Sequence, residues 1–125
     1  MYLKELSKIE KIKEMRKKIK DLRLVVVVEG RRDREAISSL GFERIITIDG
    51  KPIFKIPDLI RPKERVLILT DFDKEGKRKA KKLKFLLTKK GVEVEEQLRK
   101  LFSKNFRIRK IEELNSLFKK VSPLL

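Results

Sequence analysis

Three acidic residues that directly follow apolar runs are the first candidates for chemistry in this sequence. Glu29 follows the run LVVVV, and Asp71 and Asp73, one residue apart, follow the run LILT. Because the chain contains no His and no Cys, carboxylates are its plausible metal ligands, and they suit Mg²⁺, Mn²⁺ or Ca²⁺. An ion held there could polarise a phosphoryl oxygen and position a water at a scissile phosphate. The structural alternative is that Asp71 caps a helix N-terminus and Asp73 interacts with that helix's dipole.

These carboxylates can act together only if the fold brings the apolar runs side by side. Residues 24–28 form a continuous, mostly β-branched run, which is typical of a strand buried on both faces of a parallel sheet. Residues 45–48 and 65–70 are further apolar segments and predict two more strands. In such sheets ligands bind outside the carboxyl ends of the strands. If the first and third strands are neighbours, Glu29, Asp71 and Asp73 converge on one edge.

Helical spacing, caps and terminal glycines predict the elements between these strands. Helices are expected at 2–21, from 32 or 33 to 40, at 74–90, 95–102 and 111–120, with one helical turn at 58–60 and a fourth strand at 107–110. Strands alternating with helices indicate an α/β fold with a mostly parallel sheet of about four strands flanked by helices. We expect an N-terminal basic amphipathic helix over 1–22 and one domain over 23–125.

The N-terminal segment carries a single apolar stripe at spacings of three and four residues. Its members are Leu3, Leu6, Ile9, Ile12, Met15, Ile19 and Leu22. Such a stripe indicates a helix packed on the domain. A basic arm and a coiled-coil dimer seam remain alternatives, since the last four of these residues also fit an a/d pattern. The sequence is compatible with a monomer or a homodimer.

The charge of the chain favours a polyanionic partner. Lys and Arg number 35 against 19 Asp and Glu, which gives a formal net charge of +16. Such an excess favours nucleic acid or a ribosomal particle, because neutralised phosphates release counterions. An anionic membrane surface and a merely basic surface are the alternatives. No signal peptide is visible, and the longest apolar run is far below the roughly 20 residues that span a bilayer. We therefore expect a cytoplasmic protein with no membrane partner.

Basic side chains lie close to the acidic ones in the sequence. Those at the helix starts would face the same sheet edge and could bind phosphate, Arg through a bidentate fork and Lys as a point charge. Arg31 and Lys74 are the first candidates, followed by Arg32, Lys77 and Arg78. Aromatic residues are few, so a phosphate-gripped duplex or folded RNA fits better than a stacking platform for single strands.

The two acidic motifs together resemble those of the Toprim domain. VVVVEGRRD at 25–33 and LILTDFDKEGKR at 67–78 match its glutamate-glycine motif and its D-x-D-x-x-G motif, in the right order and about forty residues apart. The domain is shared by topoisomerases, bacterial primases, OLD-family nucleases, RecR-type recombination proteins and the maturase of 5S ribosomal RNA. The resemblance covers roughly residues 23–118 and is strongest to small stand-alone Toprim proteins related to that maturase.

The resemblance implies roles for individual residues. Glu29 would act as general acid or base, or as a metal ligand, and Asp71 and Asp73 would bind Mg²⁺, with Mn²⁺ as a possible substitute. Asp33 would be a further ligand, or alternatively a helix N-cap. Gly30 and Gly76 would allow close backbone approach. Phe72 stands where many members carry Pro, and we expect it to be packed in the protein.

The resemblance also limits the function. The single Tyr, Tyr2, lies in the terminal helix without a companion domain, which argues against DNA strand passage, and no zinc-binding module supports a primase. A metal-dependent, nuclease-like protein acting on structured RNA, or less favourably on DNA, is the leading interpretation. A non-catalytic nucleic-acid-binding module in ribosome biogenesis or DNA repair is the alternative, and a nucleotidyl-transfer protein a third. Ribosomal particles or repair proteins are the corresponding partners.

Overall fold

Four parallel strands form the central sheet of the computed structural model, which describes residues 2–124 and the side chains from residue 6 onward. The strands are β1 (Leu24–Val28), β2 (Arg44–Thr47), β3 (Arg65–Ile68) and β4 (Glu93–Glu95), in the order β2-β1-β3-β4. Every neighbouring pair is parallel. The predicted α/β fold is therefore confirmed, and β1 and β3 are neighbours, as the convergence of the acidic residues requires.

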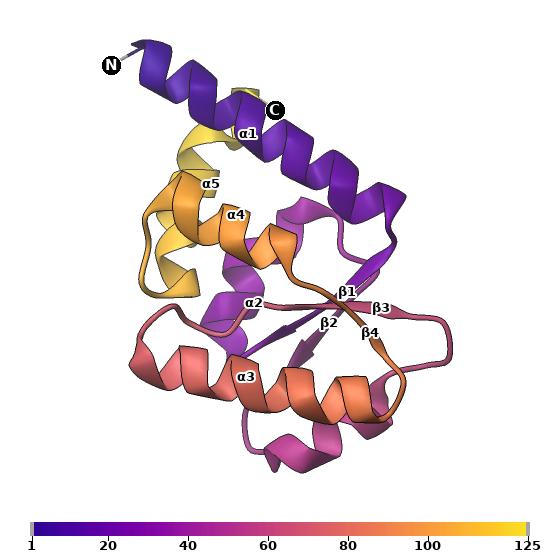
Figure 1. The fold of residues 1–125 in the computed structure, drawn as a ribbon. Helices are drawn as coiled ribbons and strands as arrows, with labels where there is room; N and C mark the ends of the chain where they lie inside the picture. The colour runs from indigo at the N-terminus through magenta and orange to yellow at the C-terminus, as the bar shows by residue number, and fades with distance from the viewer. Residues whose placement is uncertain (1, 125) are drawn as a thin grey trace.

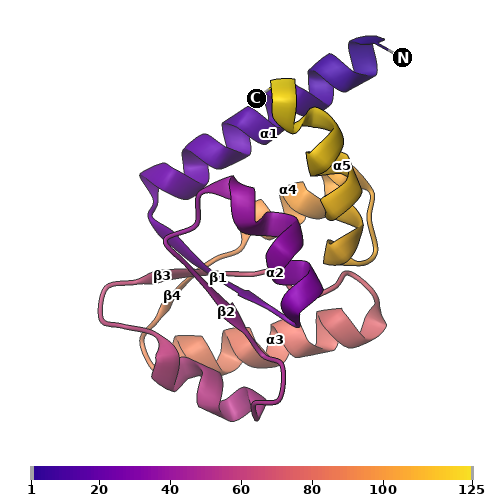
Figure 2. The ribbon, with the colours of Figure 1, turned by 180° about the vertical axis from the view of Figure 1, so that it is seen from behind.

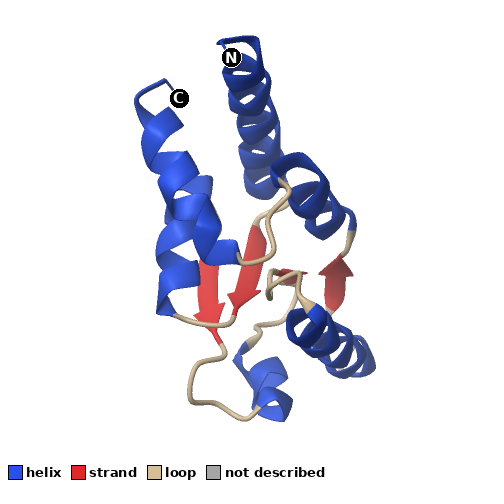
Figure 3. Cartoon of the chain, turned by 90° about the vertical axis from the view of Figure 1, so that its left-hand side faces the viewer, coloured by secondary structure: helices blue, strands red, loops and turns tan. Residues whose placement is uncertain are grey.

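Both faces of the sheet are covered by helices (Figures 1 and 2). On one face lie α3 (Lys74–Lys89) and a 3-10 helix at Ile53–Leu59. On the other lie α1 (Tyr2–Asp21), α2 (Arg31–Ile37), α4 (Gln97–Phe106) and α5 (Leu114–Val121). The side view separates these two helical layers from the strands between them (Figure 3). Side chains of strand β1 pack against both helical layers. Val25 and Val27 lie in the core cluster on the α3 face, and Val26 and Val28 lie in the cluster on the opposite face.

Helix α1 packs its apolar stripe onto the domain. Ile9, Ile12, Met15 and Ile19 are buried in the same cluster as strand β1 and helix α4. Of the residues that fit an a/d pattern, Ile12, Met15 and Ile19 are thus buried within the chain and Leu22 is partly buried against the same cluster, which argues against a coiled-coil seam; Leu6 of the stripe is exposed. The side chain of Leu3 lies outside the described residues. Although α1 is the longest helix, none of the helices in residues 2–124 is long and apolar enough to cross a membrane.

The predicted fourth strand at residues 107–110 is wrong. Helix α4 runs on to Phe106 and ends at Arg107, whose φ of 50° lies in the left-handed region; a 3-10 helix at Ile111–Glu113 follows. The fourth strand is instead β4, which pairs with β3 through Arg65 opposite Glu93 and through two further residue pairs. It is a three-residue edge strand with two glutamates, so it carries too little apolar pattern to be recognised beforehand.

The other predicted elements are found with shifted ends. Helix α2 begins at Arg31 and is continued by a 3-10 helix at Ser38–Leu40, which ends at Gly41 with φ 87°, consistent with the predicted C-cap. Strand β3 stops at Ile68 instead of residue 70. The proline-rich loop contains the longer 3-10 helix at Ile53–Leu59 in place of a single turn at 58–60.

Candidate metal and nucleic-acid site

Glu29 and Asp71 meet where β1 and β3 end. The Oε2 atom of Glu29 accepts a hydrogen bond of 2.8 Å from the backbone N–H of Asp71, 42 residues further along the chain. Its other oxygen, Oε1, accepts a hydrogen bond of 2.7 Å from Nζ of Lys79 on helix α3. The parallel register of β1 and β3 puts their carboxyl ends side by side and makes this contact possible. The Glu29 carboxylate is therefore held in one orientation from two sides.

The two aspartates of the D-x-D motif have different partners. Oδ1 of Asp73 accepts a hydrogen bond of 2.8 Å from the backbone N–H of Gly76 and caps helix α3. Oδ1 of Asp71 accepts one of 2.9 Å from the backbone N–H of Ile111. The cap expected for Asp71 in the structural alternative is thus made by Asp73. Asp71 instead ties the end of β3 to the C-terminal part of the chain.

Arg99 on helix α4 holds the loop that carries both aspartates. Its Nη1 donates to the carbonyl oxygens of Ile68 and Thr70, at 3.2 and 2.8 Å, and its Nη2 to that of Asp71 at 3.1 Å. The guanidinium carbon lies 4.7 Å from the centroid of the Phe72 ring. Phe72 is only 9% exposed, so the expectation that it is packed is confirmed.

Gly76 is required by a close backbone contact. A Cβ added at this position would overlap the carbonyl group of Asp71, whereas nothing in the described structure lies within 4 Å of a Cβ added at Gly30. The hydroxyl of Thr70 donates a hydrogen bond of 2.7 Å to the carbonyl of Gly76 from the other side. The loop and the first turn of α3 are thus packed backbone to backbone.

Burial and mutual repulsion raise the pKa values of two site carboxyls. The pKa of Asp33 is raised to about 6, mainly by burial and then by the charge of Asp71, with smaller contributions from Glu29 and Glu112. A hydrogen bond of 3.1 Å from the backbone N–H of Gly30 opposes this shift. The pKa of Asp71 is also raised, mainly by burial and further by the negative charge of Glu29, whereas the hydrogen bond from the backbone N–H of Ile111 lowers it. Excess negative charge is concentrated here, and a cation would relieve it.

Glu29, Asp33 and Asp71 line one open hollow at the sheet edge, which we call the acidic hollow. Its lining includes Glu29, Asp33, Asp71 and Glu112, together with Arg31, Arg32 and Lys110. Within residues 6–124, no three acidic side chains lie close enough to one another to hold an ion jointly. Mg²⁺ usually keeps several waters and binds through one or two carboxylates plus substrate phosphate. The residues therefore fit a hydrated ion on Asp71 with Glu29 or Asp33, and not an all-protein cage.

Comparison with known proteins identifies the family. The profile of the Toprim domain matches residues 23–97, which contain Glu29 and the D-x-D motif. The chain belongs to the Toprim domain family. It is 34% identical over 122 residues to a UPF0292 protein of Pyrococcus furiosus, covering 94% of this chain and 89% of the relative. A UPF0292 protein of Methanocaldococcus jannaschii is 37% identical over 100 residues, covering 76% of this chain and 78% of the relative.

A solved structure supports the same fold. The structure of a protein from Aquifex aeolicus aligns with a TM-score of 0.69 and 34% sequence identity, covering 81% of this chain and 95% of that one. The Toprim profile ends at residue 97, whereas Arg99 and Ile111, which contact the D-x-D loop, come after it. The C-terminal helices of this Toprim protein thus complete the support of the site.

The basic residues proposed for phosphate binding divide into three groups in this Toprim protein. Arg31 and Arg32 line the acidic hollow, and Nη1 of Arg32 lies 3.9 Å from a carboxylate oxygen of Glu112. Lys77 lines a separate groove between α3 and α4. Lys74 and Arg78 are exposed and line neither, and Arg78 is paired with Glu75 at 2.6 Å.

Three basic residues of the Toprim site were missed from the sequence. Lys79 falls within two turns of the D-x-D motif, and this proximity is a signal that could place it near Glu29. Arg99 and Lys110 carry no comparable signal, because their positions depend on how helix α4 and the segment after it fold back over the sheet.

Replacing Asp33 by Asn should stabilise this Toprim protein at neutral pH. The pKa of Asp33 is raised from 3.8 to about 6 in the folded state. Between these two pH values the folded protein therefore binds more protons than the unfolded chain. The free energy of unfolding of the wild type therefore falls as pH rises through the window. Asn keeps an oxygen that can accept from the Gly30 N–H. Urea unfolding in EDTA should show Asp33→Asn more stable by about 1–3 kcal/mol at pH 7.5.

The matched control is Asp49→Asn, at an exposed position outside the hollow. It should change stability by less than about 0.5 kcal/mol at either pH. At pH 4 the advantage of Asp33→Asn should largely disappear, because the wild-type carboxyl is then protonated when folded. A pH-independent advantage would show that repulsion at the hollow is not its cause.

Proposed function

We propose that this Toprim protein is a metal-dependent nucleic-acid-processing enzyme that cleaves a phosphodiester bond in structured RNA, with DNA as the less favoured substrate. The observation that carries the proposal is the Glu29 carboxylate, held against the N–H of Asp71 at the shared end of β1 and β3. Beside it, burial and then repulsion from Asp71 raise the pKa of Asp33. Arg31 and Arg32 at the rim are suited to phosphate. Side chains suited to acid-base chemistry, cation binding and phosphate binding are thus adjacent.

The chain's own residues would divide the work. Asp71, with Glu29 or Asp33, would hold Mg²⁺, or Mn²⁺ in its place, and the bound ion would stabilise negative charge on the phosphoryl oxygens. Glu29 would accept a proton from the attacking water as its oxygen bonds to phosphorus and the bond from phosphorus to the leaving oxygen breaks, and the leaving oxygen would take a proton from solvent. The Lys79 ammonium, 2.7 Å from Oε1 of Glu29, would hold this carboxylate in position. Arg99 would keep the carbonyl groups of the D-x-D loop in place.

RNA is favoured by the charge and by the kind of surface. A net charge of +16 supports binding through many phosphates. The Arg residues at the hollow provide charged forks for phosphate, and folded RNA is recognised largely by shape and backbone. The maturation of ribosomal RNA is the corresponding process, with ribosomal particles as partners; a repair complex would be the counterpart for DNA.

Replacing Glu29 by Gln should abolish metal-dependent cleavage without abolishing binding. Gln retains an oxygen that can accept from the Asp71 N–H but cannot take up a proton at neutral pH. Folded precursor RNA incubated with Mg²⁺ or Mn²⁺ should be cut by the wild type, and at least about 100-fold more slowly by Glu29→Gln. The control is Glu43→Gln, at an exposed glutamate, which should cut at the wild-type rate. Equal cutting by wild type and Glu29→Gln would refute the assigned role.

A non-catalytic binding module is the second candidate, and one observation favours it. Glu29 is already engaged by Lys79 and by the Asp71 N–H, and Asp73 is engaged as a helix cap, so the described carboxylates are largely satisfied within the chain. In that case an ion would bridge protein and phosphate without any reaction. Tight binding by both wild type and Glu29→Gln, with no cutting of any RNA or DNA, would establish this function instead.

A further inference from the structure

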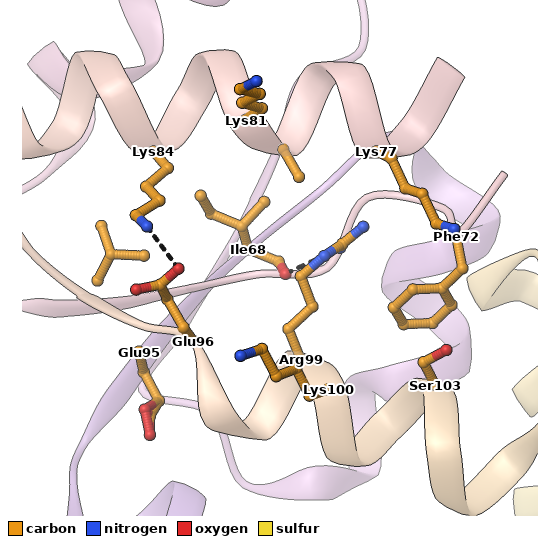
Figure 4. A pocket seen from close by; sticks show the side chains of 12 residues that line it. Ile68, Phe72, Lys77, Lys81, Lys84, Glu95, Glu96, Arg99, Lys100 and Ser103 are labelled. Carbon is orange, nitrogen blue, oxygen red and sulfur yellow. Dashed lines mark hydrogen bonds and ion pairs between the residues drawn. The ribbon is translucent and has the colours of Figure 1, made fainter. Parts of the chain in front are cut away.

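A second hollow lies on the other side of the D-x-D loop, between helices α3 and α4 (Figure 4). It has a volume of about 410 Å³, within the range of small-molecule sites. Its floor is apolar and is made by Ile68 of β3, Ala80 of α3 and Val94 of β4, and Phe72 lies at one end. Ile68 and Phe72 are buried, so the floor is fixed by the core. We call this hollow the α3–α4 groove.

Unpaired ammonium groups surround this apolar floor. Lys77 and Lys81 project from one face of α3, and Lys100 comes from α4 opposite (Figure 4). Within residues 6–124 their side chains form no hydrogen bond or ion pair. At the far end Lys84 is neutralised by Glu96 at 2.6 Å. Lys77 lies at the end nearer Phe72 of the D-x-D loop, and Lys81 and Lys100 lie between it and the end where Glu95 and Glu96 line the groove (Figure 4).

The α3–α4 groove and the acidic hollow share this loop. Phe72 lines the groove, whereas its neighbour Asp71 lines the hollow. Lys77 lies in the first turns of α3, the helix that Asp73 caps. The α3–α4 groove and the acidic hollow are therefore adjacent across this loop. Arg99 is engaged by three carbonyl groups and so forms part of the wall.

We propose that the α3–α4 groove binds an unpaired nucleotide of the substrate, next to the phosphate bound at the acidic hollow. The base would lie on the floor of Ile68, Ala80 and Val94, and its phosphate would be bound by Lys81 and Lys100. An apolar floor with a cationic rim matches the two chemical parts of a nucleotide. The inference rests on the proposed function for the path of the strand, and it narrows the substrate to structured RNA with a single-stranded segment at the cut.

The test compares a fluorescent RNA hairpin carrying a three-nucleotide tail with the same hairpin without the tail. Anisotropy in EDTA should show about tenfold tighter binding of the tailed hairpin by the wild type. Lys81→Gln/Lys100→Gln should lose this gain. The matched control Lys89→Gln/Lys104→Gln, which removes the same charge from exposed positions on the same two helices, should keep it. Equal affinity of the wild type for both hairpins, or an unchanged gain in the groove variant, would overturn the proposal.

Two further probes test whether the base contributes to binding and whether the groove prefers a nucleotide within a strand to a free mononucleotide. A tail without bases should bind no better than the blunt hairpin, and a full gain from it would overturn the role of the floor. Free AMP should displace the tail only at millimolar concentration; displacement at micromolar concentration would make the groove a mononucleotide site and overturn the substrate assignment.

The outcome is distinguishable from that of the proposed function. If the tail strengthens binding as expected but no metal-dependent cleavage is found, nucleotide binding in the α3–α4 groove is supported and the proposed nuclease activity is refuted. If both hairpins are cut with equal kcat/KM and the tail adds no affinity, the proposed nuclease activity is supported and nucleotide binding in the α3–α4 groove is refuted.

Discussion

Replacing Gly76 by Ala should destabilise the protein by about 2–4 kcal/mol, because the added methyl group has no room. The new Cβ would overlap the backbone carbonyl of Asp71, and backbone cannot move aside as a flexible side-chain end can. The same carbonyl accepts from Arg99, and the Gly76 carbonyl accepts from Thr70, so both partners of the clash are held. Relief would require the loop to separate from the first turn of α3. Urea unfolding followed by circular dichroism measures the loss.

The matched control is Gly30→Ala, because nothing in the described structure lies within 4 Å of its added Cβ and its φ of −150° suits any residue. Its cost should stay within about 1 kcal/mol, as for a changed helix cap. Equal destabilisation by both substitutions would contradict the tight packing inferred at Gly76. The Gly76 substitution should also shift Asp71, so a stable variant would still show weakened metal binding.

The central pair of strands could be predicted because the residues of β1 fit only one environment. Five successive apolar residues without polar alternation require burial on both faces, and all five are buried. Once β1 is central, the place of Glu29 beside the end of β3 follows from parallel pairing. The motif also predicts a close backbone approach at Gly76, and the structure shows that the approaching group is the carbonyl of Asp71.

The rest depended on contacts between distant segments. Strand β4 has only three residues, two of them charged, and it exists because the turn after α3 brings it against β3. The sequence could not tell which aspartate caps α3, since both lie near the helix start. Lys79 and Glu29 are 50 residues apart, and Arg99 and Asp71 are 28 apart. No local pattern encodes such pairs, because tertiary packing decides which long side chains meet.

Replacing Asp71 by Asn should weaken divalent-ion binding by about 100-fold. Asp71 lines the acidic hollow, and its pKa is raised by burial and by Glu29, so a cation would relieve the repulsion there. Asn keeps an oxygen for the Ile111 N–H but removes the negative charge. Because protons compete with metal at Asp33 and Asp71, wild-type affinity should also fall as pH drops below about 6.

The most direct test of the account is titration of Mn²⁺ into the wild type, Asp71→Asn and the exposed control Asp49→Asn, with free Mn²⁺ measured by electron paramagnetic resonance. The account predicts saturable binding at pH 7.5 by the wild type and the control, and affinity lower by about 100-fold in Asp71→Asn. The same affinity in all three proteins would contradict a metal site at Asp71, and with it the proposed phosphodiester chemistry.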